Sequence, residues 1–78
     1  MDKNQIFEKL TEIFQDVLDN EDIVVTETTN AEEIEEWDSL SNIQLVVAIE
    51  KEFGIKFSSS EIMTWNNVGD MVESILKK

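Results

Sequence analysis

The sequence predicts an all-α fold, a small four-helix bundle of three main helices plus one short helix, with a long loop between helices 1 and 2. Apolar residues recur at helical spacing in three segments, and residue types that cap helices stand at their ends. The one stretch with β-propensity, residues 23–26, has no second strand to pair with. The 78 residues suffice for a modest core, so we expect residues 1–78 to form a single domain.

Residues 4–18 are expected to form the first helix, because their apolar residues follow the spacing of one helical face. These residues are Ile6, Phe7, Leu10, Ile13, Phe14, Val17 and Leu18. Asp19 and Asn20 favour turns and should end the helix.

The connection over residues 19–38 holds nine acidic residues and no lysine, and we expect an extended loop. Ile23 and Val25 point to one side of it and should be buried in the core, while Asn30 can cap one helical turn over 31–34. Loops of this length in small domains are usually functional.

Residues 39–53 are expected to form the second helix. Asp38 is a strong N-cap residue, and Gly54 stands where helices commonly end in the left-handed conformation. Ile55 can then supply the apolar contact that accompanies such an ending.

Two shorter patterns predict the remaining helices. Residues 58–61 match a capping box, so a short helix should run through 61–64. Asn67, with Asp70 three residues later, should open the last helix, whose C-terminal end carries lysines at 77–78 where the helix dipole favours cations. Its apolar residues are Val68, Met71, Val72, Ile75 and Leu76.

The composition indicates a folded protein and excludes several classes of site. Leu, Ile, Val and Phe number 25 of the 78 residues, a larger share than in disordered chains. The absence of cysteine and histidine excludes disulfides, thiolate metal sites, histidine-dependent triads and His-ligated zinc. The net charge of −12 repels nucleic acid and anionic membranes and favours partners with basic patches.

The sequence also bears on location. The longest apolar run, residues 45–49, is too short to span a bilayer, and residues 1–5 do not form a signal peptide. We therefore expect a cytoplasmic monomer that neither inserts into membranes nor binds nucleic acid.

The second predicted helix carries apolar residues on two faces. Leu45, Val46, Ile49 and Phe53 share one face, whereas Leu40, Ile43 and Val47 lie roughly opposite, beside Gln44. Such a helix is either buried centrally among its neighbours or has a protein partner on its second face, and the sequence leaves both interpretations open.

Ser39 stands at the first position of this helix. A phosphate ester on Ser39 would lie near unpaired backbone amides and the positive end of the helix dipole. The alternative is that Asp38 merely caps the helix and Ser39 is an ordinary residue of its first turn.

The chain resembles the acyl carrier protein and peptidyl carrier protein family over essentially its whole length. The residues that carry the resemblance are Asp38-Ser39-Leu40, Ile43, Leu45-Val46-Val47-Ala48-Ile49-Glu50, Glu52-Phe53-Gly54-Ile55 and Val68-Gly69-Asp70. The resemblance implies that Ser39 is the covalent attachment point of 4′-phosphopantetheine, transferred from coenzyme A by a phosphopantetheinyl transferase. Asp38 would help to present Ser39 to that transferase and its metal ion. No metal is expected in the chain itself.

The resemblance further implies a carrier and no enzyme, which shuttles acyl groups as thioesters between partner enzymes. The expected partners are an acyl- or aminoacyl-activating ligase and an acyltransferase or synthase, besides the transferase. The expected partner-binding residues are Leu40, Ile43, Gln44, Val47, Glu36 and Trp37. Trp37 is expected first of all to anchor the loop by packing, and the role of Trp65, at the core or at an acyl pocket, stays open.

Glu36 and Trp37 stand where carriers of core fatty acid synthesis typically have Gly-Ala or a similar pair. A Trp-Asp-Ser-Leu sequence is similar to stand-alone carriers of specialised pathways, so we expect a function outside core fatty acid synthesis. An aminoacyl carrier, D-alanyl or peptidyl, is the alternative.

A more remote alternative is an acidic helical protein-interaction module without a prosthetic group. An EF-hand is disfavoured, because Val24 stands where its calcium loop needs glycine.

Overall fold

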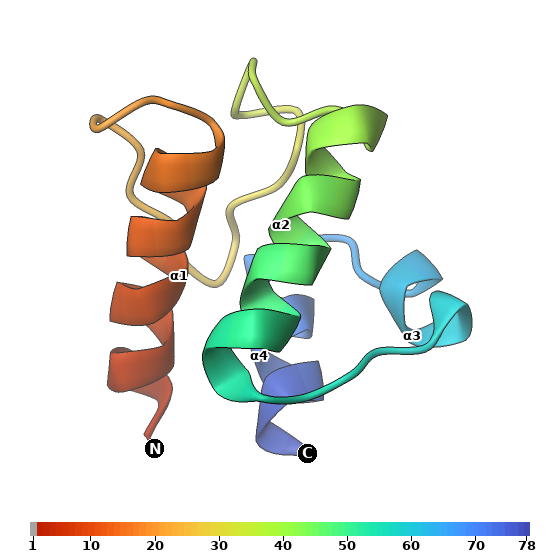
Figure 1. The fold of residues 1–78 in the computed structure, drawn as a ribbon. Coiled ribbons are helices and arrows are strands. Elements are labelled where there is room, and N and C mark those ends of the chain that lie inside the picture. Colours follow the sequence, from red (N-terminus) through yellow and green to blue (C-terminus); the bar gives the residue numbers. More distant parts are fainter. Residues whose placement is uncertain (1) are drawn as a thin grey trace.

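The computed structural model describes residues 2–78 and confirms the all-α prediction with three main helices and one short helix. The helices are α1 (Lys3–Val17), α2 (Ser39–Phe53), α3 (Ser59–Met63) and α4 (Val68–Leu76). In Figure 1, α1 and α2 stand side by side, α4 lies behind them and α3 lies to one side. Both termini lie at the end of the molecule opposite the start of α2, and no helix within residues 2–78 is long and apolar enough to cross a membrane.

Helix α1 starts and ends one residue earlier than predicted. A side-chain oxygen of Asp2 accepts from the backbone N–H of Gln5 at 2.9 Å, and the Gln5 side chain accepts from the N–H of Asp2 at 3.0 Å. This capping box fixes the helix start at Lys3. At the other end Asp19 has a positive φ of 52°, so the chain leaves the helix there, as its turn preference predicts.

The predicted ends of α2 are confirmed, whereas α3 begins two residues earlier and ends one residue earlier than the predicted 61–64. Gly54 closes α2 with φ 65° and ψ 40°, in the left-handed region, and the N–H of Ile55 donates to the Glu50 carbonyl. Ser58 caps α3, which ends at Met63 with Thr64 as its C-cap.

Helix α4 opens with the predicted cap. The side chain of Asn67 accepts from the N–H of Asp70, while a carboxylate oxygen of Asp70 accepts from the N–H of Asn66 at 2.9 Å.

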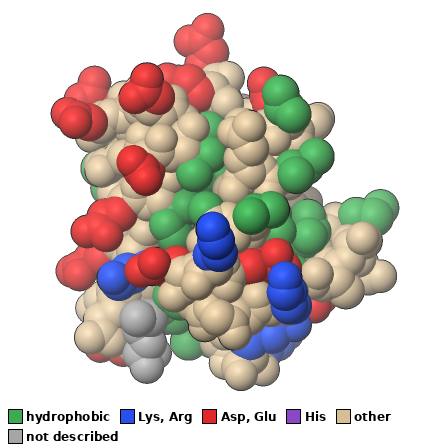
Figure 2. Space-filling view, viewed as in Figure 1, with side chains coloured by type: hydrophobic (Ala, Val, Ile, Leu, Met, Phe, Trp, Pro, Cys, Tyr) green, Lys and Arg blue, Asp and Glu red, His purple; other side chains and the backbone are tan. Residues whose placement is uncertain are grey.

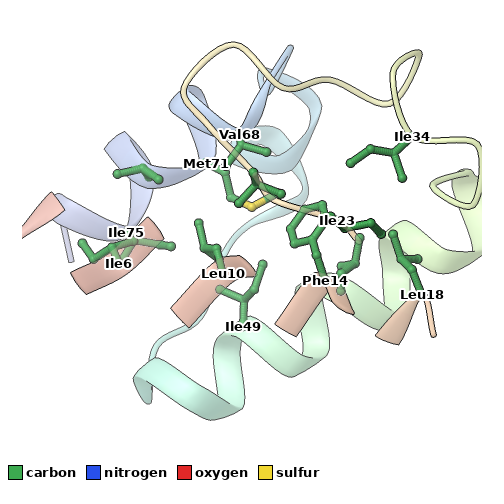
Figure 3. Packing of buried hydrophobic residues seen from close by; sticks show 13 residues of the cluster. Ile6, Leu10, Phe14, Leu18, Ile23, Ile34, Ile49, Val68, Met71 and Ile75 are labelled. Carbon is green, nitrogen blue, oxygen red and sulfur yellow. The ribbon is translucent and has the colours of Figure 1, made fainter. Parts of the chain in front are cut away.

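The core lies between α1, α2, α4 and the inner side of the α1–α2 loop, as Figure 3 shows. The loop contributes Ile23 and Val25 to it, as predicted, and also Ile34. Val24, between the two buried residues, is 70% exposed, which confirms the extended alternation of the loop. The Oδ1 atom of Asn30 accepts hydrogen bonds from the backbone N–H groups of Glu32 and Glu33 and so caps a single turn. This turn does not extend into a helix.

The α1–α2 loop is fastened to the start of α4 through its backbone. The N–H of Val68 donates to the carbonyl of Thr29 at 2.8 Å, and the N–H of Gly69 donates to the carbonyl of Glu27 at 2.9 Å. These amides belong to the first turn of α4, where a helix offers them no internal partner. Two loop carbonyls and two helix amides therefore satisfy one another.

Gly69→Ala should destabilise the protein. A Cβ at this position would lie 2.7 Å from the Glu27 carbonyl oxygen, which is backbone and must move. Overpacking of this kind typically costs about 1–3 kcal/mol, and urea unfolding would measure it. Ser60→Ala, at the same position of α3 but exposed, should change the stability by less than about 0.5 kcal/mol. A Gly69→Ala variant as stable as the original chain would contradict the close approach.

Candidate functional site

Ser39 is exposed at the first residue of α2, and its neighbours hold the helix start in one geometry. A carboxylate oxygen of Asp38 accepts from the N–H of Ser41 at 2.9 Å, and the Ser41 hydroxyl oxygen accepts from the N–H of Asp38 at 2.8 Å. The Ser41 hydroxyl also donates to the Glu36 carbonyl at 2.9 Å. The Ser39 hydroxyl has no hydrogen-bond partner within residues 2–78, so it is available for reaction while the backbone around it is fixed.

The carboxylate of Asp38 is stabilised in its ionised form. The hydrogen bond from the backbone N–H of Ser41 is the main cause that lowers the pKa of Asp38 below its ordinary value. Asp38 is therefore an anion beside Ser39 near neutral pH, which suits its role as the cap of α2.

Trp37 anchors the loop just before this site. Its ring meets Phe14 edge-on, with centroids 4.9 Å apart and an interplanar angle of 87°. Its Nε1 donates to Oδ1 of Asn42 at 3.0 Å. The half-buried indole thus joins the end of the loop to α1 and α2, as expected of a packing anchor.

A cleft of about 420 Å³ opens beside Ser39. Trp37, Asp38 and Ser39 form one side of it, and Ile62 and Trp65 contribute from the α3 region. The remaining residues of its wall are Ala31, Asn42, Asn66, Asn67 and Met71.

Trp65, whose role the sequence left open, both contacts the core and lines this cleft. Its ring meets Phe57 edge-on at 4.8 Å, and its Nε1 donates to the Ser74 hydroxyl at 2.8 Å. Trp37, just before α2, and Trp65, just after α3, therefore both contribute apolar surface to the same cleft.

The structure decides between the two interpretations of α2. Leu45 and Ile49 are fully buried, whereas Leu40, Ile43 and Val47 are 69%, 64% and 53% exposed. The interpretation of α2 as a helix covered on both faces is wrong, because α1 and the rest of the core cover only the face of Leu45 and Ile49. The exposed face also carries Gln44, and it starts at Ser39.

Sequence reasoning missed Met63, which is 84% exposed on α3. A helix of five residues is too short to show the periodicity that would have assigned its faces.

The remaining predicted site residue, Glu36, is exposed beside the site, and one of its carboxylate oxygens accepts from Nδ2 of Asn20 at 2.8 Å. This contact ties the end of the loop to its beginning. Within residues 2–78 no group of three or more acidic side chains is placed to hold a metal ion.

Comparison with known proteins matches this geometry to one family. A family model described as the phosphopantetheine attachment site covers residues 8–75. The acyl carrier proteins of Thermosynechococcus vestitus and Thermotoga maritima are each 33% identical to this chain, over 79 and 76 residues. Those alignments cover 100% and 97% of this chain and 96% and 94% of the two relatives.

The fold matches as well. The solution structure of a holo acyl carrier protein from Geobacter metallireducens aligns with a TM-score of 0.87 and 42% identity. The alignment covers 92% of this chain and 83% of that one.

The capping role of Asp38 predicts a pH dependence of stability. The pKa of Asp38 is lower in the folded chain than in the unfolded one. The ionised carboxylate therefore stabilises the folded state above about pH 4, and this stabilisation is lost as the pH falls through the folded-state pKa. Asp38→Asn keeps a good cap but cannot ionise. Thermal unfolding should therefore show a smaller acid-induced loss of stability in Asp38→Asn than in the original chain.

The control is Glu8→Gln, which removes one exposed charge that has no hydrogen bond within residues 2–78. It should retain the acid sensitivity of the original chain. Equal acid sensitivity of the original chain and Asp38→Asn would show that the cap does not depend on ionisation.

Proposed function

The chain belongs to the acyl carrier protein family, and from this premise we propose that it carries acyl groups as thioesters on a 4′-phosphopantetheine arm attached to Ser39. Members of this family are carriers and not enzymes. The main support for Ser39 as the attachment point is its exposed hydroxyl at the start of α2, which makes no hydrogen bond within residues 2–78. Ser39 also lies inside the matched residues 8–75. The arm would supply the thiol that this chain lacks, since the chain contains no cysteine.

In the attachment reaction, this chain would supply the Ser39 hydroxyl. The Ser39 oxygen would form a bond to the phosphorus of the pantetheine phosphate of coenzyme A, and the bond to the nucleotide half would break. The nucleotide half leaves as adenosine 3′,5′-bisphosphate, and the serine proton passes to the transferase. The phosphodiester would then lie beside the first amides of α2, where the helix dipole favours an anion.

The surroundings of the other serines favour Ser39. Ser41 is engaged on both sides by backbone groups, Ser58 caps α3, and Ser74 accepts from Trp65. Ser59 and Ser60 are the instructive comparison, because both are exposed, at the first and second positions of α3. Neither follows an acidic residue, and the helix to which both belong has only five residues.

Ser39→Ala should abolish modification, because it removes the reacting oxygen and leaves the cap of α2 to Asp38 and Ser41. Intact-protein mass spectrometry after incubation with coenzyme A and a promiscuous phosphopantetheinyl transferase would measure the gain of one phosphopantetheine group. The matched control Ser59→Ala should be modified like the original chain. No gain in the original chain, or a gain that survives Ser39→Ala, would defeat the assignment in favour of an acidic interaction module.

We also propose that partner enzymes dock on the surface next to Ser39. The proposed contacts are Leu40, Ile43, Gln44, Val47, Glu36 and Trp37. The exposure of the first five and the position of the half-buried Trp37 just before α2 support this assignment. The partners would be the transferase, an acyl- or aminoacyl-activating ligase and an acyltransferase or synthase. The chain itself is proposed to act as a single domain, as a monomer and in the cytoplasm.

The pathway is proposed to lie outside core fatty acid synthesis. The support is the Glu36-Trp37 pair before the serine, together with an exposed α2 face on which apolar and neutral residues prevail. An aminoacyl cargo is the second candidate, because Asn42, Asn66 and Asn67 line the cleft beside Ser39 and offer amide groups to a polar load.

The holo protein should therefore be a poor substrate for its host's fatty acid synthase enzymes. The assay would compare its acylation and elongation with those of the host's main fatty acid carrier, at equal concentrations of modified protein. Equal rates for the two carriers would place this chain in core fatty acid synthesis instead.

A further inference from the structure

The cleft beside Ser39 presents a particular set of unused hydrogen-bonding groups. On one side of it, Nε1 of Trp37 donates to Oδ1 of Asn42 at 3.0 Å. Because an indole N–H can only donate, this bond fixes which way the Asn42 amide points. Nδ2 of Asn42 therefore keeps its N–H donors, which have no partner within residues 2–78. Asn42 follows Ser39 by three residues on α2, so the two side chains share one face of the helix.

The other side of the cleft repeats this arrangement. Oδ1 of Asn67 accepts from the backbone N–H of Asp70 at 2.9 Å, again a group that can only donate, so Nδ2 of Asn67 is left without a partner within residues 2–78. Nε1 of Trp65 is used by the Ser74 hydroxyl, so the indole offers the cleft apolar surface alone. The free amide groups of Asn42 and Asn67 are therefore donors, while their oxygens are already engaged.

The charge of the cleft narrows the choice of ligand further. Among residues 2–78, Asp38 is the only charged one that lines the cleft. On the face shown in Figure 2, the lysines lie at the lower end of the molecule, away from the start of α2. No cation in the wall would compensate the charge of a nucleotide or a carboxylate. The cleft suits a neutral ligand that combines carbonyl acceptors with compact apolar groups.

Resting on the proposed function, we infer that Asn42 and Asn67 hold the 4′-phosphopantetheine arm in this cleft, through hydrogen bonds from their Nδ2 groups to the amide carbonyls of the arm. Between its phosphate and its thiol the arm carries no charge. Its geminal dimethyl group supplies compact apolar surface for the indoles of Trp37 and Trp65. The cleft volume of about 420 Å³ lies within the usual range of small-molecule sites, about 300–1,000 Å³.

Covalent attachment favours the arm over any other ligand of this cleft. An arm bonded to the Ser39 oxygen starts in the cleft wall, so its effective concentration there is high. A load on the thiol begins only where the arm ends. A long alkyl chain would also cover the donors of Asn42 and Asn67 without offering them acceptors, which costs free energy. The exposed Asn66, whose side chain makes no hydrogen bond within residues 2–78, is left for a polar load beyond the arm.

The docked arm is one of two states in exchange. Hydrogen bonds between neutral groups compete with hydrogen bonds to water, so the net preference for docking is modest. A partner enzyme draws the arm out by offering it better contacts, which shifts the population toward the extended state. Asn42 and Asn67 thus keep the arm on this chain between encounters without blocking its delivery.

The experiment compares the apo protein with the holo protein made by a promiscuous transferase, using ¹⁵N-labelled chain and NMR. The side-chain amide signals of Asn42 and Asn67 should shift when the arm is attached. Nuclear Overhauser contacts should join the methyl groups of the arm to the indole protons of Trp37 and Trp65. The side-chain amide of Asn20, which donates to Glu36 away from the cleft wall, should keep its shift as an internal control.

Variants of the holo protein test the two donors separately. Asn42→Asp keeps the oxygen that Trp37 needs and removes the N–H donors, while Asn67→Ser keeps a good helix cap and the neutral charge. Each should reduce the contacts between the arm methyls and the indoles at least about twofold, because one of two hydrogen bonds is lost. The matched control Asn66→Asp adds the same charge to the same wall and should keep these contacts. Unfolding curves would verify that all variants are folded.

The inference is overturned if attachment of the arm leaves the side-chain signals of Asn42 and Asn67 unchanged. It is equally overturned if Asn66→Asp weakens the contacts as much as Asn42→Asp, or if Asn67→Ser keeps them in full. Shifts that appear only after a long acyl group is loaded on the thiol would assign the cleft to the cargo instead. In each of these cases mass spectrometry shows a modified Ser39, whereas failure of the proposed function leaves the original chain without any gain in mass.

Discussion

The fastening of the α1–α2 loop to the start of α4 is the constraint on which the rest of the structure depends. Helix α4 begins with amides that need acceptors, and a long loop has carbonyls that need donors. Thr29 and Glu27 meet Val68 and Gly69, and both needs are satisfied at once. Without this exchange, the middle of the loop would lose its backbone attachment to α4, and its path toward Asp38 would rest on its apolar side chains and on the contacts of Ile23, Val25 and Glu36.

From that point the geometry of the site follows in a short chain of contacts. Ile34 enters the core after the capped turn at Asn30, and Trp37 then packs on Phe14. The loop can therefore reach α2 along only one path, and Asp38 with Ser41 converts its end into a helix start. Groups on both sides of Ser39 thus fix the position of its backbone, although its own hydroxyl takes part in none of their hydrogen bonds.

Most helix ends are decided locally by residue type and were predicted, whereas burial and ion pairing depend on tertiary contacts and were not. Asp38, Gly54, Ser58 and Asn67 mark helix ends by their own chemistry, so those ends were found. The start of α1 was placed one residue late because the reciprocal pair of Asp2 and Gln5 was overlooked, although its spacing is that of a capping box.

The two apolar faces of α2 were visible in the sequence, but which of them the core covers depends on where α1, α4 and the loop pass. The pairing of Glu52 with Lys9 of α1 likewise exists only in the folded chain.

The anchoring of the α1–α2 loop to the core and to α4 explains how this loop can carry so much negative charge. Nine acidic residues between 19 and 38 repel one another and favour an expanded chain, whereas the proposed attraction of a basic partner would require them close together. The fold reconciles these demands because Ile23, Val25 and Ile34 bury the inner side of the loop and hydrogen bonds from α4 hold its backbone. These contacts are apolar or made by neutral backbone groups, so salt that screens the outer charges leaves them in place. Of the loop carboxylates, Glu27 pairs with Lys3 at 3.3 Å, but the contacts that fasten the loop to the core and to α4 involve no ion pair.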